Sequence, residues 1–436
     1  MTEAAKPLRK PQTRPLTLRL LGGLVLYLST WYCGPVARTG KGRGREGAGL
    51  YPQLAALGII EGSSPALVSL VGRQCALLPS YQIARRELAA RGTALGIKVV
   101  HRIARQLGAA VLTSRTRDLW RWRAGVLTPG SDLSGRRVAA MVDGGRTRLR
   151  TVIRKQKGKG KGKKQRRRYK AEWREPKLLI IFEIDEQGRM KKKTRPWIDG
   201  TFAGPDEAME LLAFHLHCLG ATEAEVVVFA ADGAPWVWER LDWVERRVGL
   251  AAGRVVRVLD WCHAVHNLSL ALAALRLPEE ERQRRYAELR HCLREGWWGL
   301  VVDELETLGA AAGSPKDLEQ PLGYLTKHGE AGHLDYKRLR RRGLPQGSGA
   351  IESAIRRVIN LRLKGPGLMW QEENAEGALA LRAAAVSERW EETMAWVREE
   401  MGRDRQLGWQ WVAPDMPAEL KADVPIKPPV PQNAVA

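Results

Sequence analysis

The feature that most constrains the fold is a set of short apolar runs, each of which ends beside an aspartate. Such runs are typical of buried strands, and the polar residue marks the point where a strand leaves the core. Helical patterns at 205–219 and 236–247 flank these runs, and the alternation predicts an α/β fold with parallel pairing. We expect the aspartates at the carboxyl ends of the strands, where such sheets bind ligands. The runs and their aspartates are 138–142 with Asp143, 226–230 with Asp232, and 255–259 with Asp260.

Two further apolar runs, 149–153 and 178–184, are also expected to be strands. The segment 154–170 between them contains eleven Lys or Arg among seventeen residues. Such a run is usually a solvated loop, but its length and charge also suit contacts with a phosphate backbone that do not read the base sequence. The DNA contacts expected here are Lys163, Arg166 and Arg167.

The chain carries a large excess of positive charge. Its 436 residues include 72 Lys and Arg against 48 Asp and Glu, a formal net charge of +24. This excess indicates a polyanionic partner, either nucleic acid or an anionic membrane surface. No apolar run approaches the roughly 20 residues of a membrane span. The five cysteines include no C-x-x-C pair, so they specify neither a disulfide framework nor a four-cysteine zinc site, and a reducing cytosol fits them best.

Near the N-terminus, the segment 16–28 alternates apolar and polar residues around Gly22 and Gly23. This pattern predicts a β-hairpin that turns at the two glycines. The alternative is a signal peptide, because basic residues precede an apolar stretch. A Gly/Arg-rich linker follows at 38–49.

The next region predicts two short helices, 80–88 and 97–107, the second of them stopped at Gly108. Two helices joined by a glycine-containing turn suggest a helix-turn-helix, whose second helix enters the DNA major groove. The alternative is a basic helical hairpin with no role in DNA binding, since helix-turn-helix spacing is a weak signal. The side chains expected on the DNA-facing side are Lys98, His101, Arg102 and Arg105.

Residues 261–344 show long charged helical stretches and no strand pattern, so we expect an all-helical insertion there. The last residues are rich in proline and are expected to form a disordered tail. The expected division is 1–50 hairpin and linker, 51–130 helix-turn-helix region, 131–275 first part of the catalytic core, 276–346 helical insertion, 347–402 second part of the core, and 403–436 tail.

The stretch 347–356 reads as a loop that opens into a helix, with Ser348 or Gly349 at its start. Glu352 lies off the apolar face of this helix and on one side with Arg356 and Asn360. The alternative for Glu352 is a surface ion pair with Arg356. The apolar face is formed by Ile351, Ile355, Val358 and Ile359.

Three acids therefore stand out by position: Asp143, Asp232 and Glu352. If the strands form one sheet, these side chains can converge. Phosphoryl transfer on nucleic acids commonly uses two Mg²⁺ ions, one at the attacking oxygen and one at the leaving oxygen. Mg²⁺ prefers carboxylate oxygens, and two or three carboxylates suffice because water and substrate phosphate complete the shell.

Several motifs occur in a characteristic order along the chain. They are Val142-Asp143-Gly144, Ala231-Asp232-Gly233-Ala234-Pro235-Trp236, Asp260-Trp261-Cys262-His263, the stretch Gly343-Leu344-Pro345-Gln346-Gly347-Ser348-Gly349-Ala350-Ile351-Glu352-Ser353, and Arg362-Leu363-Lys364-Gly365 with Trp370. In these motifs the chain resembles DDE transposases of bacterial insertion sequences, in the group related to Mutator-like elements. The resemblance spans roughly 65–396 and implies an RNase H-like mixed sheet with flanking helices and a helical insertion before the glutamate.

The resemblance implies that Asp143, Asp232 and Glu352 are the catalytic triad, binding two Mg²⁺ ions for which Mn²⁺ can substitute. It also implies that Asp260 and His263 form the Asp/Cys-x-x-His element, whose histidine lies near the scissile DNA. Relatives often carry an amino-terminal paired-cysteine element, which this chain lacks, so we predict a hairpin without zinc. The pair His263 and His266 could in principle bind zinc, but no second pair of soft ligands lies at a useful spacing.

The predicted function is that of a DNA transposase that cleaves element ends and joins the 3′-hydroxyl to target DNA. The partners expected are double-stranded DNA and further copies of this chain, in a homodimer or larger assembly in the prokaryotic cytoplasm at the nucleoid. The alternatives are a catalytically silent DNA-binding protein and an RNase H-type nuclease without strand transfer. Beyond the residues above, DNA contacts are expected from Arg356, Lys364 and Trp370, the last by stacking on an unpaired base.

Overall fold

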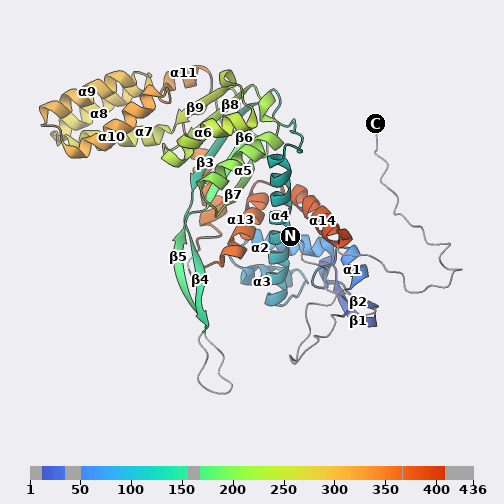
Figure 1. Ribbon diagram of the computed structural model, residues 1–436. Helices are drawn as coiled ribbons and strands as arrows, with labels where there is room; N and C mark the ends of the chain where they lie inside the picture. The colour runs from blue at the N-terminus through green and yellow to red at the C-terminus, as the bar shows by residue number, and fades with distance from the viewer. Residues whose placement is uncertain (1–11, 35–50, 156–166, 366, 408–436) are drawn as a thin grey trace.

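A five-stranded mixed sheet lies at the centre of the protein, with the strand order β7-β6-β3-β8-β9 (Figure 1). β3 pairs in parallel with β8 and β8 with β9, whereas β6 runs antiparallel to both β3 and β7. The strands are β3 (Arg137–Gly144), β6 (Lys177–Glu183), β7 (Trp197–Thr201), β8 (Val226–Ala231) and β9 (Val255–Leu259). The computed structural model describes residues 12–34, 51–155, 167–365 and 367–407.

Helices cover both faces of this sheet. Every residue of β8 is buried, and so are six of the seven residues of β6, although alternate side chains point to opposite faces. The covering helices include α5 (Pro205–Cys218), which contacts β6 and β7, and α12 (Gly349–Ile355), which contacts β3 and β6. The predicted α/β class and the four predicted strands of this sheet are confirmed.

β4 (Thr147–Lys155) and β5 (Arg167–Arg174) form a separate antiparallel ribbon, which extends away from the sheet beyond β3 and β6 (Figure 1). The prediction of a loop over 154–170 is therefore wrong at both of its ends, because β4 reaches Lys155 and β5 begins at Arg167. Cross-strand pairing orders these ends despite their charge. The middle of the segment, including Lys163 and Arg166, lies outside the described residues.

The predicted N-terminal hairpin is confirmed. β1 (Gln12–Arg19) pairs with β2 (Val25–Tyr32), and Gly22 and Gly23 at the turn have φ of 79° and 84°. Positive φ is the conformation that glycine adopts without steric cost. A Cβ on Gly23 would lie 2.3 Å from the carbonyl oxygen of Gly92. The hairpin turn therefore contacts the turn that joins the helices Tyr81–Ala90 and Ile97–Arg123.

The helix predicted to stop at Gly108 instead continues as α4 (Ile97–Arg123). Gly108 packs against Gly377 of α13 (Glu372–Val386), where a Cβ would lie 3.0 Å from the Gly377 Cα. Glycine is used here for close approach of two helices, at a cost in helix propensity of about 1 kcal/mol relative to alanine. The stop prediction is therefore wrong.

A second apolar core joins the N-terminal helices to the C-terminal ones. It is formed by α2 (Pro65–Leu77), α3 (Tyr81–Ala90) and α4 together with α13 and α14 (Trp390–Leu407). Arg382 of α13 donates to the carbonyl oxygens of Ala76 and Leu77 at 3.0 and 2.8 Å, which satisfies backbone acceptors at the end of α2. The N-terminal helices therefore pack on segments from the other end of the chain.

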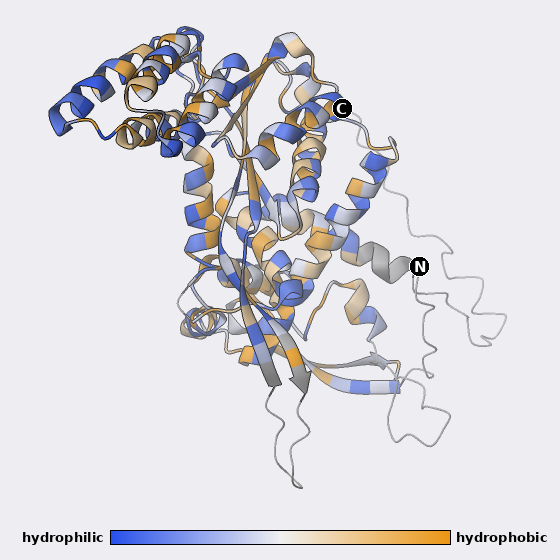
Figure 2. Cartoon of the chain, turned by 60° about the vertical axis from the view of Figure 1, so that its left-hand side comes forward, coloured by the Kyte–Doolittle hydropathy of each residue, from blue (hydrophilic) through white to orange (hydrophobic). Residues whose placement is uncertain are grey.

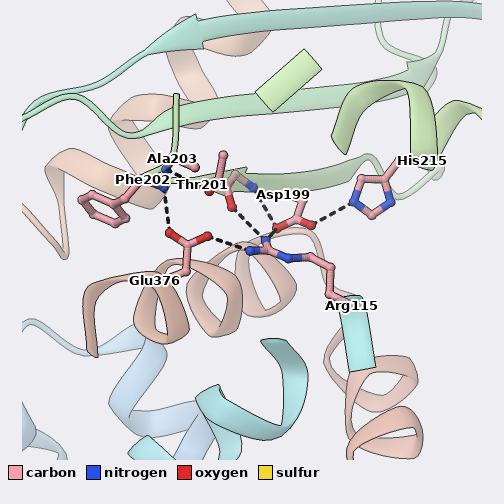
Figure 3. Close-up of polar contacts among 8 residues, drawn as sticks. Arg115, Asp199, Thr201, Phe202, Ala203, His215 and Glu376 are labelled. Atoms are coloured by element: carbon pink, nitrogen blue, oxygen red, sulfur yellow. Dashed lines mark hydrogen bonds and ion pairs between the residues drawn. The ribbon is translucent and has the colours of Figure 1, made fainter. Parts of the chain in front are cut away.

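A buried polar network fixes this second core to the sheet (Figure 3). Arg115 of α4 forms ion pairs with Asp199 of β7 at 3.0 Å and with Glu376 of α13 at 2.6 Å. Asp199 also accepts from His215 Nε2 at 2.8 Å. These charges hold the pKa of Asp199 below its usual range against the opposing effect of burial. Arg115 thus links α4, β7 and α13 through these two ion pairs.

Between β9 and α12 the chain forms only helices, α7–α11, which project from one end of the sheet as a helical arm with α11 at its base (upper left of Figure 1). Figure 2 shows hydrophilic residues interspersed along these helices. Within the described residues, no helix is both long and apolar enough to cross a membrane. The helices are α7 (Trp261–Ala274), α8 (Glu279–Arg294), α9 (Trp298–Ala311), α10 (Lys316–Glu330) and α11 (Tyr336–Arg341).

Candidate active site

Asp143 and Asp232 lie side by side at the carboxyl ends of neighbouring parallel strands. The register that pairs Met141 with Ala230 brings Asp143 level with Asp232, one residue beyond the end of β8. Neighbouring strands lie about 5 Å apart, and residues at the same register position face the same side of the sheet. The two carboxylates therefore emerge at one edge, as the sequence predicts.

The third acid, Glu352, reaches this edge from α12. Ile351, Ala354 and Ile355 of α12 are buried, and Glu352 is exposed. Among the described residues Glu352 forms no ion pair with Arg356, so the alternative of a surface Glu352–Arg356 pair is not observed. A π-helical turn at 356–360 follows α12 directly, and such turns are frequent at functional sites.

The electrostatics of Asp143 link the predicted site residues. Burial raises the pKa of Asp143 to about 6, and the charges of Asp232 and Glu352 act in the same direction. The Gly144 N–H, 2.6 Å from Asp143 Oδ1, and the imidazole of His263 act in the opposite direction. In the described part of the chain, no Lys or Arg pairs with any of the three carboxylates. They form a cluster of like charge that a cation would stabilise.

The donor set fits Mg²⁺ by its chemistry, since it offers only carboxylate oxygens. Within the described ranges, no three His, Cys, Asp or Glu side chains lie close enough to hold a metal ion unaided. Mg²⁺ usually takes one or two protein carboxylates and completes its shell with water and substrate phosphate. Asp143 lies level with Asp232, and its pKa is affected by the charges of both Asp232 and Glu352, so it is the carboxylate that links the other two.

Asp260, which follows β9, is buried and accepts hydrogen bonds from within the protein. Its side chain is 2% exposed. It accepts from the backbone N–H of His263 at 3.0 Å and from the Ser348 hydroxyl at 2.8 Å, and also from the Ser348 N–H. Ser348 precedes α12 as predicted, but its hydroxyl binds Asp260 instead of capping that helix. Asp260 therefore fastens the loop before Glu352 to the start of α7.

His263 lies half-buried on the first turn of α7, with its backbone N–H bonded to Asp260. Because α7 begins directly after β9, the strand that pairs with β8, His263 lies at the same end of the strands as Asp232. Its neighbours on α7, Cys262 and His266, are exposed.

Two tyrosines near this site carry no sequence signal that would have identified them. The Tyr324 hydroxyl, from α10, donates to the backbone carbonyl of Asp232 at 3.0 Å. Gly233 makes room for this contact, because a Cβ there would lie 2.4 Å from the Tyr324 hydroxyl oxygen. The Tyr336 hydroxyl donates to the Leu259 carbonyl at the end of β9, also at 3.0 Å. The helical arm thus supports the strand ends that carry the acids.

The predicted DNA contacts on α4 fall into two groups. Lys98 and Arg105 are exposed, and neither pairs with a carboxylate in the described part of the chain. Arg102 forms an ion pair with Glu61 at 2.6 Å, and His101 packs edge-on against Tyr81 with ring centroids 4.5 Å apart. Burial, followed by the charge of Arg105, lowers the pKa of His101.

Of the contacts predicted after α12, Arg356 and Lys364 are exposed. Trp370 is not available for base stacking, because its side chain belongs to the core. Its residue is 8% exposed, and its indole N–H donates to the Leu363 carbonyl at 3.1 Å. The guanidinium of Arg362 lies 4.9 Å from the ring centre. The prediction of a stacking role for Trp370 is therefore wrong.

A cavity of about 340 Å³ lies elsewhere, between β7, α5 and α14, and contains none of the three acids. Comparison of the chain with family models, with curated proteins and with solved structures found no match.

Proposed function

We propose that the protein is a DDE-type DNA transposase that uses Mg²⁺ to cleave DNA at the ends of an insertion sequence and to join the freed 3′-hydroxyl to target DNA. The observation that carries this proposal is that Asp143, Asp232 and Glu352 come together at one sheet edge and that no Lys or Arg of the described residues pairs with them. Like-charged carboxylates held together are unfavourable unless a cation binds them.

The order and directions of the five strands support an RNase H-like core, the fold that the resemblance implies. The helical segment between β9 and α12 supports the same assignment, since it lies before the glutamate in the chain. The exposed Lys98 and Arg105 support a DNA-binding role for α3 and α4 as a helix-turn-helix. Assembly as a dimer or larger oligomer on DNA is part of the proposal.

In this proposal Asp143, Asp232 and Glu352 are the side chains that would hold Mg²⁺. The metal would supply charge stabilisation for the attacking and leaving oxygens of the phosphodiester. Asp260 and Ser348 keep the loop before Glu352 in place, and Tyr324 holds the backbone that presents Asp232. The role proposed for His263 is to donate a hydrogen bond to a phosphate oxygen near the cut.

The test uses supercoiled plasmid carrying the DNA that flanks the gene, incubated with the protein and Mg²⁺. We expect cleavage at the element ends and joined products, with Mn²⁺ able to replace Mg²⁺. Asp143→Asn, Asp232→Asn and Glu352→Gln should each abolish cleavage and leave end binding nearly intact, because each removes a ligand charge but little volume. Glu306→Gln, at an exposed position of α9, is the matched control and should cleave normally.

Each alternative gives a different pattern. Cleavage without joined products would indicate a nuclease, and end binding without cleavage would indicate a silent DNA-binding protein. Normal cleavage by one of the three variants would remove that residue from the triad.

A further inference from the structure

One face of the β4–β5 ribbon combines arginines with aromatic rings. Cross-strand pairing places Arg148 opposite Trp173 and Arg150 opposite Ala171, so alternate residues of both strands line the same face. Two guanidinium groups lie over the ring of Trp173, those of Arg146 and Arg148, at 5.4 and 5.2 Å from its centre. The guanidinium of Arg150 lies 5.9 Å from the ring centre of Tyr169.

These side chains are exposed and their charges are not neutralised. Trp173 is 49% exposed and Tyr169 48%. In the part of the chain that the structure describes, Arg146, Arg148 and Arg150 form no ion pair with a carboxylate. Other arginines, such as Arg123 with Glu210, are paired. Large aromatic side chains left half in water beside unpaired cations indicate a binding surface rather than a packed core.

The opposite face of the ribbon holds it in place. Leu149 and Thr147 are buried, and the Thr147 hydroxyl donates to the Leu363 carbonyl at 2.8 Å. Backbone hydrogen bonds also join Arg148 and Arg150 to Trp370, at 3.0 and 2.7 Å. The arginine-aromatic face is therefore presented by a strand that is fixed to the segment after α12.

The ribbon also starts at the candidate active site. β3 ends at Gly144, directly after Asp143, and Arg146 is only three residues beyond that aspartate. A nucleic-acid strand that lies along the ribbon therefore leads directly to the carboxylates. The three arginines follow one another at every second residue, which is about 7 Å per step along the strand.

We propose that this face binds an unpaired DNA strand beside the cleavage site, with Trp173 and Tyr169 stacking on exposed bases and the three arginines contacting phosphates. The location beside the cut rests on the proposed function, whereas single-strand binding by this face does not. Grooves that combine positive charge with exposed rings bind single strands without sequence preference, because every base has a π-face. In this proposal Trp173, in place of Trp370, is the tryptophan that stacks on an unpaired base.

The test measures binding to a labelled 20-nucleotide thymidine strand and to a duplex of the same length by fluorescence anisotropy. EDTA is present throughout, so catalysis plays no part. Trp173→Ala should weaken single-strand binding by roughly five- to a hundred-fold and duplex binding much less, while Trp173→Tyr should retain most of the affinity. Replacement of all three arginines by Ser should lower the salt dependence of single-strand binding by about 2 in the log–log slope.

Trp297→Ala is the matched control, because Trp297 is 47% exposed on the helical arm with the Lys337 ammonium 5.8 Å from its ring centre. It should bind both DNAs like the unmodified chain. Equal effects of Trp173→Ala and Trp297→Ala, or equal losses on single strand and duplex, would overturn the proposal. Loss of binding to phosphatidylserine vesicles in Trp173→Ala, with DNA binding unchanged, would replace it by a membrane surface.

The outcome is separable from that of the proposed function. Single-strand binding through Trp173 by a chain that never cleaves DNA would refute the transposase and leave this binding face. If the unmodified chain cleaves and joins DNA while the Trp173→Ala variant binds single strands normally, the transposase proposal stands and the binding face is refuted.

Discussion

Asp260 and Ser348 lie 88 residues apart in the sequence and are joined by two hydrogen bonds, from the Ser348 N–H and from its hydroxyl to one carboxylate oxygen. Trp261 adds a third link, because its N–H donates to the Gln346 carbonyl at 2.9 Å. The loop that carries Glu352 towards the sheet edge is thus fastened at the point where β9 meets α7. In the proposed enzyme, Asp260 and Ser348 are positioning residues that do not touch substrate.

Ser348→Ala removes one hydrogen bond from a buried carboxylate. We expect the free energy of unfolding to fall by about 1.5–3 kcal/mol, since bonds to charged groups are the stronger ones. Thermal and denaturant unfolding would measure the loss. Ser353→Ala, an exposed position of α12, should change stability by less than about 0.5 kcal/mol. Equal stabilities of the two variants would show that the Asp260–Ser348 link contributes nothing.

His263→Ala tests a chemical role against a structural one. If the imidazole stabilises charge near the cut, the cleavage rate should fall roughly ten- to a thousand-fold with the melting temperature nearly unchanged. His266→Ala, also on α7 but exposed, should behave like the unmodified chain. A lower melting temperature with the normal rate per folded molecule would assign His263 to the core.

Arg115→Met leaves Asp199 and Glu376 without their shared cation. We expect a loss of about 3–5 kcal/mol of stability, because removing one partner of a buried ion pair strands a charge. Arg123→Met breaks the exposed pair with Glu210 and should cost at most about 1 kcal/mol. Denaturant unfolding measures the loss of stability in each variant. Similar losses would mean that burial does not increase the contribution of the Arg115 ion pairs to stability.

Two glycines in helices should respond to alanine with opposite signs. Gly108→Ala presses a methyl group against Gly377 and should cost about 1–3 kcal/mol. Gly323→Ala in α10 meets no atom within 4 Å and should stabilise the protein by about 0.5–1 kcal/mol. Stabilisation in both variants would show that the α4–α13 crossing can widen freely.

His328 and His333 make stability depend on pH. Their Nδ1 atoms are 3.0 Å apart, and burial lowers the pKa of each to about 4, with Lys327 and, for His333, Arg257 acting in the same direction. In the unfolded chain the two imidazoles bind protons below about pH 6.5. The stability that the folded protein gains from keeping this pair unprotonated is therefore complete above about pH 6.5, and it is lost as the pH falls from about 6.5 to 4.

We expect the melting temperature to drop by about 3–6 °C from pH 7 to pH 5 through this pair. The variant His328→Gln should show a smaller drop, and His291→Gln, at an exposed position of α8, the same drop as the unmodified chain. A pH dependence identical in all three proteins would exclude the pair as its source.

The sequence predicted strands best where a strand consists almost wholly of apolar residues. β3, β8 and β9 are almost continuous apolar runs, and their positions and the acids after them were predictable. β7 was missed because it has five residues with Asp199 in the middle, and the partners that satisfy Asp199 come from α4 and α5. β5 was missed because its Lys and Arg residues look solvated until the pairing strand is known.

Two errors have the same physical origin, which is a partner far away in the sequence. A glycine in a helical pattern signals a stop, and only Gly377 on another helix makes Gly108 a packing contact. Asp260 resembles Asp143 in its position beside a strand end, and only its hydrogen bonds from Ser348 identify it as a buried acid that holds a loop. Local patterns carry no information about such partners. The metal-binding role of the triad and the DNA contacts remain predictions.

The second apolar core has a consequence for synthesis of the protein. α2, α3 and α4 are made early, but α13, the first of the two helices that complete their core, begins at Glu372, roughly 250 residues after α4 ends at Arg123. At the usual rate of about 5–20 residues per second, the ribosome needs roughly 12–50 s to reach α13. Until then the apolar faces of the early helices lack their final partners and are open to aggregation. A chain truncated before α13 would therefore fail to assemble its N-terminal region, not only its C-terminal one.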